Sequence, residues 1–327
     1  MSKYAFALFA LLVLGSTLSA APHVLFDNGH AQTAGNADWT IYGGYSDMAD
    51  AARFLGCTVS EQRKRVTRAA LHNVDIFVSP EPNSAFSKDE KTALLEFLNK
   101  GGCLFLIADH DKSDRNRDGI DSVGVINQIA DDIGIRLNKK WFSEHPITGE
   151  AITSHPVMEG VVSLGTWGGT SLEALSEGAQ VLARESHGGG YIGISEVGKG
   201  RVVVMGDSSP FDDGSGNPKD KLHDGWSNPG YTHERLAYNA LRWLLRRPND
   251  RDADKEAFSQ CLSSLNGEEQ AKVGEALERS IKKHQKTIRK IKREEVRQTW
   301  QEDLSWLEEL KTVQHRAKRF SALYSDM

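Results

Sequence analysis

Short apolar runs alternate with amphipathic segments over most of this chain. Four segments repeat apolar residues at the spacing of a helix, at 46–55, 87–99, 122–133 and 232–245. Seven runs have the length and apolar content of buried strands: 23–27, 58–61, 75–79, 103–108, 180–183, 191–197 and 201–206. This alternation predicts an α/β fold, flavodoxin-like, with a mostly parallel sheet and helices on both faces.

Local signals support this pattern at several boundaries. Ser87 and Glu90 have the spacing of a capping box, and Gly101 and Gly102 stop the same helix before the next strand. The turn at 197–200, Val-Gly-Lys-Gly, separates two strand runs at hairpin spacing. We therefore expect the sheet to gain an antiparallel pair late in the chain.

Beyond Pro248 the pattern changes to long helices. Of the 77 residues from 251 to 327, 30 are Asp, Glu, Lys or Arg. Apolar residues recur there at helical spacing, which predicts a helical hairpin or coiled-coil arm over 250–327, following an α/β domain at 22–247. We expect these helices to pack on each other or on a second copy of the chain. The basic stretch 279–293 is either a solvated helix face or a contact for an acidic partner.

The first 20 residues have the features of a secretory signal peptide. Lys3 precedes an apolar run at 4–14 that is too short to cross a bilayer, and small residues follow up to Ala21. We expect an exported protein, periplasmic or secreted, with no stable membrane span after cleavage. The net charge of −5 gives no reason to expect nucleic acid as a partner, and the three cysteines lack metal-ligand spacing.

Three apolar runs end in clusters of Asp, His and small residues. Asp27 is followed by His30, Asp109 by His110, and Asp207 by Ser208 and Ser209. Loops at the carboxyl ends of parallel strands meet at one edge of the sheet, where ligands bind. We therefore expect the three aspartates to converge and to hold a divalent metal ion (Mg, Mn, Ca or Zn), with His30 and His110 as catalytic groups.

Further polar and aromatic residues are candidates for substrate contacts. These are Asn36, Asp38, Trp39, Ser208, Ser209 and His233. Plain turns and caps explain several of them equally well. The loop 114–121, Asp-Arg-Asn-Arg-Asp-Gly-Ile-Asp, matches the first half of a calcium loop, but its twelfth position is Val125, which excludes a complete EF-hand. A partial calcium site and a polar loop remain open.

The residues from Pro22 to Arg247 resemble the class I glutamine amidotransferase-like superfamily. The resemblance rests on the Asp-Asn-Gly-His segment at 27–30, on Gly101 to His110, on His155 to Val161, and on Gly198 to Ser209. Within that superfamily, the match is best to divergent domains of intraflagellar-transport and gliding-motility proteins. No Gly-x-Cys-x-Gly elbow is present, so the resemblance implies the fold and not glutamine hydrolysis.

Two functions are compatible with these features. The first is a metal-dependent hydrolase of a phosphoester or glycan fragment. The second is a non-catalytic envelope domain that binds carbohydrate or another small ligand, with the C-terminal helices serving assembly. Substrate class and metal identity are not encoded in a readable motif.

Overall fold

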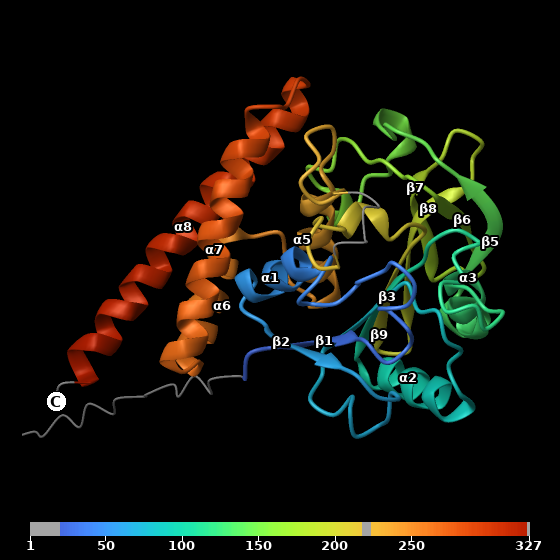
Figure 1. Cartoon of the computed structure of the whole chain (residues 1–327), viewed down its shortest axis with the longest axis horizontal. Coiled ribbons are helices and arrows are strands. Elements are labelled where there is room, and N and C mark those ends of the chain that lie inside the picture. Colours follow the sequence, from blue (N-terminus) through green and yellow to red (C-terminus); the bar gives the residue numbers. More distant parts are fainter. Residues whose placement is uncertain (1–19, 218–223, 326–327) are drawn as a thin grey trace, which may run out of the picture.

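Nine strands form one sheet in the computed structural model, which describes residues 20–217 and 224–325 (Figure 1). The order is β2-β1-β3-β4-β9-β8-β6-β5, with β7 paired to β8. The predicted signal peptide, except Ala20, lies outside the described residues. Within the described residues, no helix is both long enough and apolar enough to cross a membrane.

The first half of the sheet is parallel. It contains β1 (His23–Asp27), β2 (Thr58–Gln62), β3 (Ile76–Pro80), β4 (Cys103–Ile107) and β9 (Gly200–Met205). The order 2-1-3-4 is that of flavodoxin-like sheets, in which the strand order reverses between β1 and β3. The predicted fold class is confirmed.

The second half of the sheet is antiparallel. The predicted hairpin is β8 (Gly190–Val197) with β9, and β7 (Ala179–Arg184) pairs with β8. Two further strands, β5 (Ile135–Phe142) and β6 (Gly169–Ala174), were not predicted. In β5 the pairing register shifts between Leu137 and Trp141, and Asn138 and two lysines interrupt the alternation of apolar residues.

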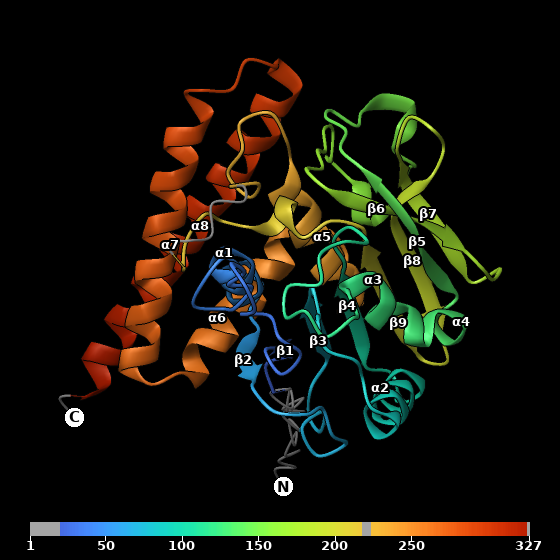
Figure 2. The ribbon, with the colours of Figure 1, turned by 45° about the vertical axis from the view of Figure 1, so that its right-hand side comes forward.

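Helices cover both faces of the sheet (Figure 2). One face carries α1 (Ser46–Phe54) and α5 (His233–Leu244), and the other carries α2 (Lys88–Lys100), α3 (Ser122–Ile126) and α4 (Ala130–Ile133). The helix predicted at 122–133 is therefore two short helices. A 3₁₀ turn, η1 (Asn127–Ile129), separates them, and the other such turns described are η2 (Gly149–Ala151), η3 (Pro156–Met158) and η4 (Ser209–Phe211).

The C-terminal helices pack on the α/β core as well as on each other. They are α6 (Arg251–Ser264), α7 (Gly267–Ile288) and α8 (Glu294–Ser325). Phe258, Leu277 and Trp306 belong to the same buried cluster as the residues of α1 and α5. The apolar stripe therefore finds its partner within one chain, whereas the sequence suggested packing within the arm or on a second copy (Figures 1 and 2).

Candidate functional site

The three predicted aspartates all lie at the carboxyl edge of the sheet, but on two faces. Successive side chains of a strand point to opposite faces. Asp27 lies two positions after Leu25, which packs toward α2, and so continues the face of Leu25. Asp109 and Asp207 lie two positions after Ile107 and Met205, which pack toward α1 and α5. Ile107 pairs with Met205 in the β4–β9 ladder. The structure thus brings Asp109 and Asp207 together and leaves Asp27 on the other face.

Asp27 and His30 form a buried ionic group with Glu90 of α2. Nδ1 of His30 lies 2.9 Å from both carboxylate oxygens of Asp27, and Nε2 lies 3.0 Å from Oε1 of Glu90. Burial opposes protonation of His30, but the two carboxylates outweigh it and raise its pKa. Hydrogen bonds from Ser87, Arg65 and Val66 outweigh the burial of Glu90 and lower its pKa to about 2.

His30 is therefore anchored between two carboxylates rather than free to shuttle protons. Its side chain is fully buried, and both ring nitrogens are engaged by carboxylates. Asp27 also accepts hydrogen bonds from the side chains of Gln32 and Ser79. A group that must exchange protons with a substrate needs a free ring nitrogen within reach of that substrate. His30 has none.

Asp109 lies in a cluster built around Arg115 and Glu81. Nη2 of Arg115 donates to Oδ2 of Asp109 at 2.8 Å and to Oε2 of Glu81 at 3.1 Å. Glu81 is fully buried and also accepts hydrogen bonds from Trp39 Nε1 and from Ser208 Oγ. Burial, with the charges of Glu81 and Asp207, holds the pKa of Asp109 well above its usual range.

Asp207 ties the carboxyl end of β9 to the segment that precedes β6. It accepts hydrogen bonds from the Thr166 hydroxyl and from the backbone amides of Trp167 and Ser209, the last two at 2.8 Å. Burial raises its pKa. Gly206 lets the end of β9 lie close to β6, because a side chain at position 206 would collide with the carbonyl oxygen of Thr170.

Most of the predicted contact residues are buried, and Asn36 and Asp38 are half-buried. Trp39, Ser208 and Ser209 are buried. Asn36 accepts a hydrogen bond from Arg115 at 3.0 Å, and Asp38 accepts one from the Thr40 hydroxyl at 3.0 Å. Their hydrogen bonds hold the loops of the carboxyl edge against one another.

His233 supports an aromatic group at the same edge. Its Nδ1 donates to the carbonyl of Gly225 at 2.8 Å, and its Nε2 accepts from the amide of Gly165 at 2.9 Å. Burial lowers its pKa to about 4, so the ring is neutral. Tyr231 stacks on this ring, with centroids 5.0 Å apart, and Trp167 contacts it edge-on.

Four aromatic side chains, which we call the aromatic rim, extend from this point toward solvent. They are Trp141, His145, Trp167 and Tyr231. His145 is exposed and stacks on Trp167, with an interplanar angle of 20°. Trp141 is 54% exposed, and its Nε1 lies close to Gly168, as does the ring of His110. His110, half-buried, is the predicted catalytic residue nearest to this surface.

The predicted metal ligands are engaged by hydrogen bonds within the protein. Over residues 20–217 and 224–325, no group of three or more His, Cys, Asp or Glu side chains is arranged to hold a metal ion. The aspartate oxygens instead accept hydrogen bonds from protein donors. In the loop 114–121, Asp114 and Asp118 accept from the backbone amides of Gly119 and Ile120, so these oxygens close turns.

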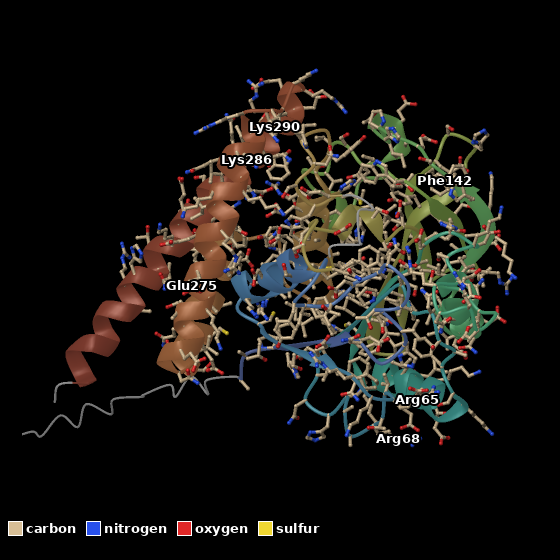
Figure 3. The ribbon with its side chains drawn as sticks, in the orientation of Figure 1. Arg65, Arg68, Phe142, Glu275, Lys286 and Lys290 are labelled. Atoms are coloured by element: carbon tan, nitrogen blue, oxygen red, sulfur yellow. The ribbon has the colours of Figure 1, made fainter. Side chains whose placement is uncertain are left out.

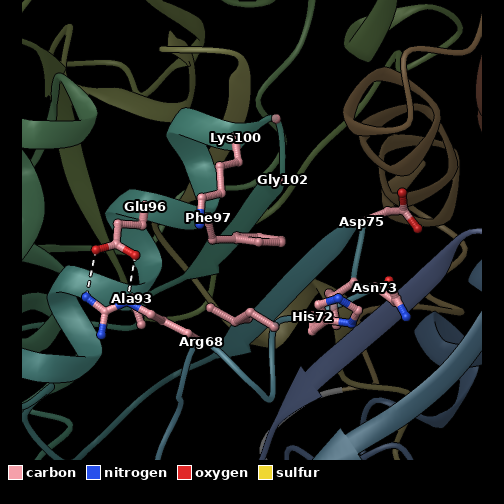
Figure 4. A pocket seen from close by; sticks show the side chains of 12 residues that line it. Arg68, His72, Asn73, Asp75, Ala93, Glu96, Phe97, Lys100 and Gly102 are labelled. Carbon is pink, nitrogen blue, oxygen red and sulfur yellow. Dashed lines mark hydrogen bonds and ion pairs between the residues drawn. The ribbon is translucent and has the colours of Figure 1, made fainter.

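The cavities described lie away from the three aspartates. One of about 390 Å³ is found between α2 and the start of β3, near Phe97, with the Arg68–Glu96 ion pair at its rim (Figure 4). Another, of about 640 Å³, lies between α1 and the C-terminal helices. Neither is lined by Asp27, Asp109 or Asp207.

Sequence reasoning missed Glu81, Arg115 and the aromatic rim. Glu81 follows the predicted strand 75–79, so the rule that selected the three aspartates would also have selected it. Arg115 was read only as part of a calcium-like loop. The rim had no signal, because its members come from β5, the loop after it, the segment before β6 and the segment before α5.

No protein-family profile matches this chain, and no curated protein matches it. Solved structures do match in fold. The mmIFT52 N-terminal domain has 14% identity and a TM-score of 0.50, and the match covers 68% of this chain and 97% of that one. The cytoplasmic protein STM1381 from Salmonella typhimurium LT2 has 15% identity and a TM-score of 0.47, covering 69% and 100%. A putative ThuA-like protein from Bacteroides uniformis has 11% identity and a TM-score of 0.40, covering 71% and 95%. The match to the mmIFT52 N-terminal domain shows a shared fold over about two thirds of this chain.

Proposed function

We propose that this chain is an exported, non-catalytic domain that binds envelope carbohydrate through the aromatic rim. We further propose that it is a divergent member of the class I glutamine amidotransferase-like superfamily, of the type found in intraflagellar-transport and gliding-motility proteins. The motifs at 27–30, 101–110 and 198–209 and the shared fold support this assignment.

The stack of His145 on Trp167, beside the exposed Trp141, carries the proposal. Sugar rings present apolar C–H faces and polar edges, and they bind flat aromatic surfaces that have polar neighbours. The rim supplies such surfaces, and His110 supplies a polar group beside them. Its place at the carboxyl edge is also where open α/β sheets bind their ligands.

Binding is better supported than hydrolysis because the candidate catalytic groups are occupied. Arg115 pairs with Glu81 and Asp109, His30 is held between two carboxylates, and His233 is neutral and bonded at both nitrogens. A carboxylate with a raised pKa, such as Asp109, is the one feature that favours a proton donor. The metal-dependent hydrolase therefore stays a prediction, tested alongside binding.

Calorimetric titration of soluble envelope glycans and oligosaccharides tests the proposal. Trp141→Ala should weaken binding by about two- to twelvefold, which corresponds to the roughly 0.5–1.5 kcal/mol of one aromatic contact. Tyr42→Ala is the matched control, because Tyr42 is also an exposed aromatic side chain but lies in a different surface region. Equal affinity of the Trp141 variant and the wild type would contradict the rim as the binding surface.

The same panel separates binding from turnover. Product release that requires Mg, Mn, Ca or Zn and disappears in Asp109→Asn would establish the hydrolase and overturn the non-catalytic proposal. Binding without product, unchanged by a chelator, is the expected result.

A further inference from the structure

The largest cavity described, about 640 Å³, lies between the α/β core and the C-terminal helices. Its walls come from α1 and β2 on one side and from α6 and α7 on the other, which lie side by side in both views (Figures 1 and 2). Its volume falls within the range of small-molecule sites, roughly 300–1,000 Å³. The proposed carbohydrate surface shares no residue with it.

The interior of this cavity is mainly apolar. Val59 of β2, Phe258 and Leu262 of α6, and Leu265 and Val273 beside them line its walls. An apolar wall of this kind binds the hydrocarbon part of a ligand, because the ligand leaves water and no polar group loses a partner.

The lining side chains include three cations and two acids. Asp50 is buried and pairs with both Arg53, at 2.7 Å, and Arg279, at 3.4 Å, so one carboxylate faces two guanidinium groups. Lys272 is a third cation, and it pairs with Glu268, one turn earlier on α7, at 2.7 Å. The other acid at the cavity, Glu269, accepts a hydrogen bond from the backbone amide of Asn266 at 2.9 Å, within the capping box that starts α7.

We propose that this cavity binds an anionic amphiphile, a molecule with a hydrocarbon body and a carboxylate or phosphate head. The hydrocarbon lies against Val59 and Leu265, which are half-buried, and the head pairs with Arg279. Arg279 is the best placed of the cations, because its contact with Asp50 is 3.4 Å long, whereas Arg53 and Lys272 each have a carboxylate at 2.7 Å.

Dodecanoate is a suitable probe, used below its micelle concentration with the full mature chain. Dodecyltrimethylammonium has the same hydrocarbon length and the opposite charge. We expect calorimetry to show one dodecanoate per chain and binding of the cation at least about tenfold weaker, since the head would meet like charges.

Two charge-matched variants on α7 locate the head group. Arg279→Gln should weaken dodecanoate binding about tenfold, as expected for the loss of one charge-assisted hydrogen bond. Lys286→Gln removes the same charge from the same helix, but Lys286 lies near the C-terminal end of α7 and does not line the cavity (Figure 3). This variant should leave binding unchanged. Leu265→Trp, which fills the cavity, should reduce binding of both probes.

Circular dichroism first establishes that each variant is folded. The proposal is overturned if folded wild-type protein binds no dodecanoate, if the cationic probe binds equally well, or if the Arg279 and Lys286 variants behave alike. The first of these results excludes the site, the second excludes its selectivity for anions, and the third excludes Arg279 as the contact of the head group. None of these outcomes depends on glycan binding.

Discussion

Glu81 joins more elements of the carboxyl edge than any of the residues predicted for it. Its carboxylate accepts hydrogen bonds from Arg115, Trp39 and Ser208, which belong to three different loops. Its backbone has a φ of 39°, in the left-handed region that non-glycine residues seldom adopt. Such a conformation persists when surrounding contacts hold it, and here its amide also donates to the carbonyl of Ile107 at 2.8 Å.

Replacing Glu81 with Ala should destabilise the protein by about 3–5 kcal/mol, because Arg115 would lose its main partner in a mostly buried setting. Urea unfolding followed by circular dichroism measures this change. Glu177→Ala is the control, because Glu177 is exposed, and should stay within about 0.5 kcal/mol of wild type. A Glu81 variant as stable as this control would show that the cluster does not hold the loops.

At the scale of elements, α7 is fixed to α5 by a buried ionic pair. Nε2 of His284 lies 3.2 Å from a carboxylate oxygen of Glu234, and Nδ1 lies 2.8 Å from the carbonyl of Ser280. Both nitrogens face acceptors, so the protonated ring suits this position. Burial opposes that charge, but Glu234 and the Ser280 carbonyl outweigh burial and raise the pKa of His284.

The raised pKa predicts a pH-dependent stability. The contribution of His284 is complete below its unfolded value, about 6.5, and is lost as pH rises through the higher folded value. The stability difference between wild type and His284→Gln should therefore be largest near about pH 6 and shrink toward about pH 9. Urea unfolding across this range measures it, with His315→Gln, an exposed histidine of α8, as the control. A constant difference would mean that the charge of His284 plays no part.

At the scale of the whole molecule, the C-terminal helices and the α/β core share one buried interior. Trp306 of α8 contacts Tyr238 of α5, with centroids 5.0 Å apart. Arg235 pairs with Asp303 at 2.6 Å, and Arg242 pairs with Asp254 at 2.7 Å. The charge-rich composition of the arm concealed this docking, because it shows which residues are polar and not which polar residues have buried partners.

Truncation after Arg247 should therefore impair folding, since it exposes the α1 and α5 surface and leaves Arg235 and Arg242 without Asp303 and Asp254. We expect a lower melting temperature or insoluble protein, measured by circular dichroism and light scattering. Trp306→Ala in the full chain should cost about 3–5 kcal/mol, whereas Glu308→Ala, on the exposed side of α8, should cost about 0.5 kcal/mol or less. A truncated chain as stable as the full one would show that the arm is separable, as the sequence pattern suggested.

The sequence by itself determined the elements. Apolar periodicity placed most of the strands and helices, because the period of a strand or helix is written in neighbouring residues. The capping box at Ser87 and the hairpin at 197–200 were read for the same reason. The pattern also placed Asp27, Asp109 and Asp207 at strand ends. It therefore placed them at one edge of the sheet, because the carboxyl ends of parallel strands meet there.

Only the tertiary structure decided which of these residues meet. The pleat separates Asp27 from Asp109 and Asp207 by sending their side chains to opposite faces. Glu81 pairs with Arg115 across 34 positions and with Ser208 across 127, and no local pattern records such distances. The aromatic rim and the docking of α7 arise in the same way. Side-chain chemistry is local, whereas burial and partnership depend on how distant segments pack.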